Sequence, residues 1–292
     1  MGYIDFGSER VRARLNISNG QLISLALDNK EFFHDGGSPH WQGNGWGNSE
    51  IIMFPLVGLP IDYAVIIGGM VFPQDQHGIS RILPFDLAGY NASSTKLIQD
   101  YEPHDMRNPK HKPGNDHPEY VFWPFAYTIQ KEFEVKDDLL IMRLTITNKS
   151  DNEMPYMCGW HPGFNLQGIV ADGEFSIDGG KRLVTLDEVI AASLDSSKSA
   201  YKLENVRSVS YHDRKSRRGV IVSSDDFKHM MIWSPGNETG MFCIEPVTHF
   251  PIHSKDELLF MRGSFECLKP GEQKTYSVTL RPFAHESIKR FQ

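Results

Sequence analysis

The chain has 292 residues, with 30 Lys plus Arg against 37 Asp plus Glu and a formal net charge of −7 at pH 7. Hydrophobic residues make up 40% of it, enough for a large packed core and too many for a disordered chain. The acidic balance and the lack of a long basic run argue against a nucleic-acid partner, so a neutral or mildly polar partner is favoured.

The N-terminal part predicts a cytoplasmic protein that does not enter a membrane. Charges begin at Asp5, no apolar segment of signal-peptide length follows, and the most apolar stretch, residues 63–72, contains two glycines. That stretch is far shorter than a bilayer span of roughly 20 residues. The three cysteines are widely spaced and odd in number, which favours reduced core thiols. We expect a monomer or a homodimer.

The sequence predicts strands almost from end to end. Residues 11–27 alternate apolar and polar side chains on both sides of Asn19-Gly20, which is a strong hairpin signal. Residues 127–135 and 139–147 repeat the alternation around a polar turn, and residues 154–160 follow, predicting a meander. Further strands are expected at 182–186, 218–223, 230–234, 241–244, 258–265 and 275–282. Only residues 186–194 suggest a short helix.

Two segments interrupt this rhythm, residues 36–50 and 101–120. Both are rich in Gly, Pro and Asn, and loops of this length in a compact domain are usually functional or disordered. No repeat, linker or low-complexity tract divides the chain. The predicted fold class is therefore all-β, a large antiparallel β-sandwich forming one domain over residues 1–292.

One histidine and one glutamate stand in matching surroundings. His161 and Glu245 each lie in an apolar run and each precede a proline, which predicts extended backbone where strands leave the sheet. Burial raises the pKa of a Glu and lowers that of a His, while mutual proximity favours both charges, so the two are expected to titrate near neutrality. Such a pair suits general acid–base catalysis. The competing interpretation is a His and a Glu that are only structural.

A third element is "QDQHGISRILPF", residues 74–85, which places His77 and Arg81 on a turn. In order, "HGISR", "GWHPGFNL" and "MFCIEP" resemble the motifs of the aldose 1-epimerase (galactose mutarotase) family. "NSEIIMFPLVG" and "MIWSPG" resemble two further segments of that family, and they add Asn48 and Trp233 to the candidate sugar-binding residues. The resemblance covers about residues 10 to 285.

The resemblance implies a β-supersandwich that interconverts the α and β anomers of an aldose. In the family, the residue matching Glu245 takes the proton of the C1 hydroxyl, and the residue matching His161 protonates the ring oxygen. Ring opening, rotation about C1–C2 and reclosure then give the other anomer. His77 and Arg81 are expected to contact and orient the sugar. No metal and no other cofactor is expected, because every step is a proton transfer.

Three departures from the family pattern leave the substrate open. Leu59 stands where many members have Arg, Gly163 replaces a larger residue, and the family's sugar-binding Asp has only Asp225 and Asp226 as candidates.

The loop "HDMRNPKHK", residues 104–112, offers a further possible site. Arg107 and its basic neighbours suggest a phosphate site, although a solvated loop is favoured. The alternatives to a mutarotase of free sugars are therefore a hexose-6-phosphate mutarotase and a non-catalytic carbohydrate-binding protein. The loop histidines match no zinc spacing.

Overall fold

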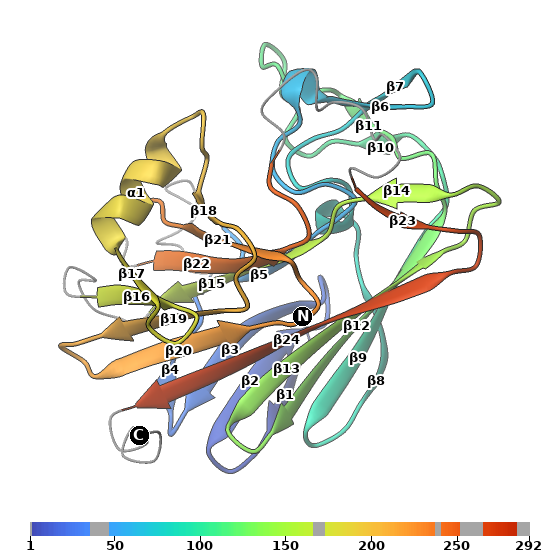
Figure 1. Cartoon of the computed structure of the whole chain (residues 1–292). Helices are drawn as coiled ribbons and strands as arrows, with labels where there is room; N and C mark the ends of the chain where they lie inside the picture. The colour runs from blue at the N-terminus through green and yellow to red at the C-terminus, as the bar shows by residue number, and fades with distance from the viewer. Residues whose placement is uncertain (1, 36–46, 166–172, 237–240, 252–264, 285–292) are drawn as a thin grey trace.

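The computed structural model describes residues 2–35, 47–165, 173–236, 241–251 and 265–284 (Figure 1). Its elements are β1 (Tyr3–Gly7), β2 (Val11–Asn16), β3 (Gln21–Leu27), β4 (Lys30–Glu31), β5 (Glu50–Met53), η1 (Ile61–Tyr63), β6 (Ala64–Ile67), β7 (Met70–Pro73), η2 (Ser80–Ile82), β8 (Asp86–Tyr90), β9 (Ser94–Tyr101), β10 (Met106–Arg107), β11 (Tyr120–Val121), β12 (Tyr127–Lys136), β13 (Leu139–Asn148), β14 (Met154–Tyr156), β15 (Gly159–Asn165), β16 (Gly173–Ile177), β17 (Arg182–Thr185), α1 (Leu186–Leu194), β18 (Tyr201–Leu203), β19 (Ser208–Asp213), β20 (Arg218–Ser223), β21 (His229–Trp233), β22 (Met241–Val247), β23 (Glu266–Leu268) and β24 (Gln273–Ala284).

Three antiparallel sheets make up most of the described fold. The largest has nine strands in the order β17-β16-β19-β20-β24-β13-β12-β9-β8. A five-stranded sheet, β18-β21-β22-β15-β5, lies above it in Figure 1, and the N-terminal strands form a four-stranded sheet, β1-β2-β3-β4. One continuous apolar core joins residues of all three. The prediction of an all-β fold with large antiparallel sheets is confirmed, and the expectation of a single domain stays a prediction.

The local strand predictions hold where one face of a strand is buried. The hairpin at Asn19-Gly20 joins β2 to β3, and β12 pairs with β13 over their whole length. Buried and partly exposed residues alternate along both β12 and β13, because one face packs on the core while the other meets solvent. Both strand pairs, β2–β3 and β12–β13, could therefore be predicted from residues that are close together in the sequence.

The predicted meander is wrong beyond β13. Residues 154–160 do not continue it, since β14 pairs with β23 and β15 enters the five-stranded sheet. The partner of β13 is instead β24, from the far end of the chain. Predicted strand 258–265 lies almost wholly outside the described residues, as does most of loop 36–50, whose last residue, Glu50, begins β5.

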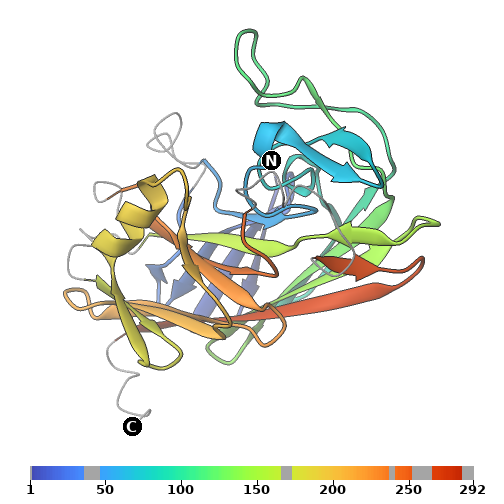
Figure 2. The ribbon, with the colours of Figure 1, turned by 45° about the horizontal axis from the view of Figure 1, so that its top comes forward.

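The predicted helix at 186–194 is confirmed as α1. It begins with a capping box, in which Thr185 Oγ1 accepts from the Glu188 amide and the Glu188 side chain accepts from the Thr185 amide. Figures 1 and 2 show α1 beside the β16–β17 end of the fold, with the β6–β7 and β10–β11 ribbons at the other end. Within the described part of the chain, no helix is long and apolar enough to cross a bilayer.

A buried ion pair ties the three sheets together. Lys131 on β12 falls on the inward face, where the alternation calls for an apolar residue, and its Nζ donates to Glu50 Oε1 on β5 at 2.8 Å. Glu50 also accepts from the Leu22 amide of β3 at 3.0 Å and from Trp160 Nε1 of β15 at 2.9 Å. Both charged side chains are almost fully buried, so each depends on the other for its solvation.

Removing one member of this pair is expected to destabilise the fold strongly. Lys131→Met leaves the Glu50 carboxylate buried without its cation, which should lower the free energy of unfolding by about 3–5 kcal/mol in urea denaturation. Lys131→Met/Glu50→Gln should recover part of this loss, because no buried charge remains unpaired. Lys136→Met, at the exposed end of the same strand, is the control. Equal losses in Lys131→Met and Lys136→Met would contradict the role of the pair.

Candidate active site

His161 and Glu245 are brought together by the pairing of β15 with β22. Gly159 pairs with Val247 and Gly163 with Cys243, so the register sets His161 opposite Glu245. His161 Nε2 and Glu245 Oε1 lie 3.5 Å apart, and their side chains are only 7% and 2% exposed. The expectation that both residues sit where strands leave the sheet is wrong, because β15 runs on to Asn165 and β22 to Val247.

The two prolines shape the sheet at this point. Recorded pairs between β15 and β22 occur at Gly159 and resume at Gly163, with none at residues 160–162. Pro162 and Pro246 flank His161 and Glu245 inside this interval, and neither has an N–H to give to the ladder. The prolines therefore keep the backbone extended but loosen the ladder beside the two side chains.

Side chains from three strands share the face that carries the pair. Met231 and Trp233 of β21 lie opposite Glu245 and Cys243 in the register, so they alternate onto the same side of the sheet. The opposite side of these strands, with Trp160 and Ile244, belongs to the main core. Both β15 and β22 are thus covered on both faces, and their sequences lack the alternation seen in β12.

Above this face lies a cavity of about 440 Å³. Strands β15, β21 and β22 form its floor, and segments 58–63, 76–81 and 196–200 form its walls. The lining residues are Gly58, Leu59, Pro60, Ile61, Asp62, Tyr63, Gln76, His77, Arg81, His161, Ser196, Ser199, Ala200, Met231, Trp233, Glu245 and Pro251. Of the seven predicted site residues, five line this cavity: Glu245, His161, His77, Arg81 and Trp233.

His77 is fixed as a neutral hydrogen-bond donor. Its Nδ1 accepts from the Gly58 amide at 3.1 Å, which assigns the ring proton to Nε2. Burial lowers the pKa of His77 well below its usual value, and the neighbouring His161 and Arg81 lower it further. The next residue, Gly78, has φ +71°, and a Cβ there would come within 2.5 Å of the Phe54 carbonyl oxygen. The turn therefore requires the glycine of the His-Gly string.

Arg81 and Trp233 complete the wall around His161. Arg81 lies on η2, and burial is the main cause that lowers the pKa of its guanidinium. Trp233 packs with its ring centroid 6.2 Å from that of His161, and His77 packs edge-on at 5.3 Å. The imidazole of His161 is thus held between two rings.

Two predicted site residues lie elsewhere. Asn48 accepts from Gln21 Nε2 at 3.1 Å and lines a neighbouring hollow, not the main cavity. The Arg107 side chain is 74% exposed, and its closest described carboxylate is Glu119 at 3.9 Å. Neither of the candidate aspartates, Asp225 and Asp226, lines the cavity. Leu59 does line it, so the Leu in place of the family's Arg removes a positive charge from the lining of the cavity.

The pKa values of Glu245 and His161 shift in opposite directions, as expected, but they do not both lie near neutrality. Burial raises the pKa of Glu245 to about 8. Burial first, and the positive charge of Arg81 second, lowers the pKa of His161 to about 3. As a coupled pair, the two groups therefore hold one proton between these values, and in the free protein that proton rests on Glu245.

The same face offers a possible set of metal ligands. Among the described residues, His161, Cys243 and Glu245 have donor atoms within 4.8 Å of one another, a combination that suits zinc. Burial raises the pKa of the Cys243 thiol well above its usual value, and only the thiolate is a good ligand. Metal-independent activity stays a prediction, which dialysis against a strong chelator would test.

Sequence reasoning missed several cavity residues. Met231 could have been found from its spacing of two from Trp233 on a predicted strand. Gln76 stands beside His77 in the quoted motif, but nothing in its type marked it out. Asp62 lies in a segment with no recognisable motif, and only the folded chain brings it to the cavity.

Comparison with known proteins identifies the family and the fold. Residues 54–281 match the family described as aldose 1-epimerase. The protein LacX (chromosomal) of Lactococcus lactis subsp. lactis is 24% identical over 282 residues, covering 83% of this chain and 86% of LacX. Among solved structures, a galactose mutarotase related enzyme from Lactobacillus acidophilus superposes with a TM-score of 0.79 at 18% identity, covering 97% and 98% of the two chains. A galactose mutarotase-like protein from Lactobacillus casei superposes with a TM-score of 0.76 at 19% identity, covering 97% of this chain and 100% of that protein.

The shifted pKa values predict how stability depends on pH. The unfolded chain ionises Glu245 above about pH 4.5, whereas the folded protein keeps the proton up to about pH 8, so the parent loses stability across this window. Glu245→Gln lacks this loss, and its Tm relative to the parent should rise from pH 4.5 to 8. The sign is reversed for His161, where stability is lost as pH falls from 6.5 to about 3. A constant Tm difference across both windows in differential scanning calorimetry would contradict the burial argument.

Proposed function

Since the chain belongs to the aldose 1-epimerase family, we propose that it interconverts the α and β anomers of an aldose by acid–base ring opening and closure. The observation that carries the proposal is the contact of 3.5 Å between His161 Nε2 and Glu245 Oε1, buried at the floor of a cavity. A cavity of about 440 Å³ lies within the range of about 300–1,000 Å³ that is usual for small-molecule sites.

The spacing of the pair fits the two oxygens that must exchange protons. In a cyclic sugar the C1 hydroxyl oxygen and the ring oxygen are bonded to the same carbon, so they lie next to each other. Two groups side by side on one wall can reach both oxygens, and they need not stand on opposite sides of the ring. The edge-on rings of His77 and Trp233 hold the imidazole of His161 for this task.

Ring opening moves two protons. Glu245, as the carboxylate, takes the proton of the C1 hydroxyl, while His161, as the imidazolium, gives its Nε2 proton to the ring oxygen. The C1–O5 bond breaks and C1 becomes an aldehyde. Rotation about C1–C2 presents the other carbonyl face, and closure with the proton movements reversed gives the second anomer. The Nε2–H of neutral His77 supports the charge that develops on oxygen.

The protonation state of the free protein matches the open-chain stage of this cycle. After ring opening Glu245 is protonated and His161 is neutral, which is the state that burial favours. Before ring opening, the shared proton must move from Glu245 to His161 across the 3.5 Å contact. Sugar hydroxyls entering the cavity replace water as partners for both charges and make this transfer possible.

Loss of either group should abolish most turnover. A positioned acid or base contributes about 10²–10⁴-fold, so Glu245→Gln and His161→Asn should each lower kcat by that order in an NMR anomer-exchange assay. The double variant should lose much less than the product of the two factors, because both groups act in one step.

Sugar binding, followed by calorimetry, serves as the control and should persist in both variants. Near-parental kcat in Glu245→Gln would show Glu245 to be a structural partner. Sugar binding by the parent without exchange of any anomer would support a non-catalytic carbohydrate-binding protein instead.

A further inference from the structure

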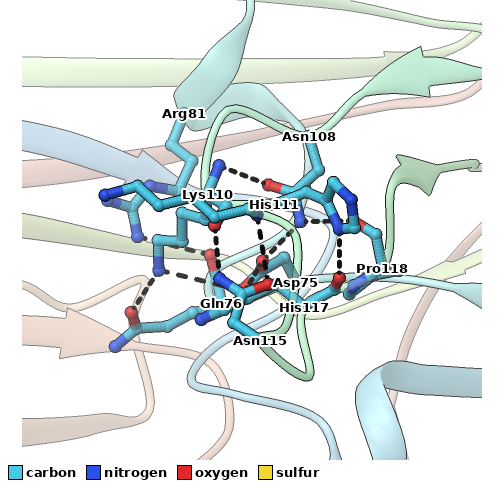
Figure 3. Close-up of polar contacts among 10 residues, drawn as sticks. Asp75, Gln76, Arg81, Asn108, Lys110, His111, Asn115, His117 and Pro118 are labelled. Atoms are coloured by element: carbon cyan, nitrogen blue, oxygen red, sulfur yellow. Dashed lines mark hydrogen bonds and ion pairs between the residues drawn. The ribbon is translucent and has the colours of Figure 1, made fainter.

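A second hollow of about 250 Å³ adjoins the cavity and shares Gln76 and Arg81 with it. Its volume equals that of several water molecules at ~30 Å³ each, enough for a small ionic group. The residues lining it are mostly polar: Asn48, Asp75, Gln76, Gly78, Arg81, Ile82, Asn108, Pro109, Lys110 and Val121. Most of this lining comes from two segments, residues 75–82 and 108–110, and Figure 3 shows Asn108 and Lys110 beside Asp75, Gln76 and Arg81.

Two cations meet in this hollow. Lys110 Nζ donates to Gln76 Oε1 at 2.8 Å and lies 3.7 Å from Asp75 Oδ1. Arg81 Nη1 makes a long bond of 3.4 Å to the Gln76 carbonyl, and in the described part of the chain no carboxylate lies within ion-pair distance of Arg81. Burial lowers the pKa of Lys110, and the charge of Arg81 lowers it further. The two side chains therefore repel each other in a partly dry site.

Among the described residues that line the hollow, Asp75 is the one acid, and it is already engaged. Asp75 Oδ2 accepts from Asn108 Nδ2 at 2.7 Å and contacts His117 Nδ1 at 2.7 Å, while Asp75 Oδ1 accepts from the Gln76 amide at 2.6 Å. Figure 3 shows these contacts converging on Asp75 and holding the loop in place. The Asp75 carboxylate attracts both Lys110 and Arg81, but one negative charge cannot offset two positive charges.

We propose that Arg81 and Lys110 bind an anionic group, a phosphate ester or a carboxylate, at the end of the aldose remote from C1. Arg81 lines both hollows, so a sugar whose C1 lies at Glu245 and His161 can extend a substituent past Arg81 toward Lys110. A charge there relieves the repulsion between the two cations and gains charge-assisted hydrogen bonds. The substrate class is then an acidic aldose, an inference that rests on the function proposed above.

The cation responsible is not Arg107, the site residue expected from the sequence, but Lys110, one of its basic neighbours in the same loop. Arg107 and Lys112 are both exposed, and neither lines either hollow, whereas Lys110 is half-buried between Asp75 and Gln76. These three residues belong to one loop and differ mainly in where their charge is placed. Arg107→Met and Lys112→Met are therefore matched controls for Lys110→Met.

The test compares kcat/KM for anomer exchange of glucose 6-phosphate, glucuronate and glucose. The parent should prefer one of the two anions to glucose, and Lys110→Met should lower that preference by about ten- to a hundredfold, the range of a charged hydrogen bond. Lys110→Arg should largely restore it, and both control variants should keep it. If Lys110→Met lowers kcat/KM selectively for glucose 6-phosphate, the bound anion is a phosphate. If it does so selectively for glucuronate, the bound anion is a carboxylate.

Three results would overturn the inference: a parent that prefers glucose, a ratio unchanged in Lys110→Met, or an equal change in Lys112→Met. Calorimetric binding of the same three sugars separates this outcome from failure of the proposed function. Anion-selective binding that Lys110→Met abolishes, in a protein that exchanges no anomer, would leave the anion site standing and remove the mutarotase activity.

Discussion

The register between β15 and β22 is the constraint on which the site depends. It sets His161 directly opposite Glu245 and sends Trp160, the neighbour of His161, to the other side of the strand. There Trp160 Nε1 donates to Glu50, whose charge is held by Lys131 from the large sheet. A slip of one residue would exchange the two faces, placing His161 in the core and Trp160 in the cavity. The buried ion pair and the acid–base pair therefore fix the same register from opposite faces.

Burial of this pair has an electrostatic cost that the protonation state reduces. A carboxylate and an imidazolium without water would each need compensation, whereas a protonated Glu245 beside a neutral His161 carries no charge. In the free protein the shared proton therefore lies on Glu245, which leaves both buried side chains uncharged. In the proposed mechanism the sugar brings the polar partners that the charged form needs, so binding of the sugar and activation of the pair are the same event. Arg81 opposes a charge on His161, and an anionic substituent on the substrate would weaken this opposition.

Much of the fold was predictable because its signals are local. The alternation in β12 and β13, the Asn-Gly hairpin and the capping box at Thr185 each act within a few residues. The partner of β13 could not be predicted, because β24 lies about 130 residues away and pairing over such distances leaves no local pattern. The ends of β15 and β22 were misplaced because a proline usually ends a ladder. Here both strands are covered on two faces and continue through it.

The residues of the candidate site also fall into those that local sequence motifs predict and those that only the folded chain reveals. His161, Glu245, His77 and Arg81 could be found because their neighbours form specific short motifs, and the fold brings all four to one cavity. Asn48 lines the second hollow and not the main cavity, and Lys110 could be named only as one of several basic residues in its loop, because the sequence does not show which of them is partly buried. Lys131 carried a signal that went unused, a charge on the inward face of an alternating strand.

The proposed mechanism depends on the proton shared by His161 and Glu245, and NMR can observe that proton directly. A carbon-detected titration of the side-chain carboxyl groups, with Glu245 assigned by comparison with Glu245→Gln, gives the pKa of this one group in the free protein. Burial of Glu245 predicts a pKa of about 8, so that the carboxyl stays protonated at neutral pH. A Glu245 that titrates near 4.5, as an ordinary glutamate does, would contradict it.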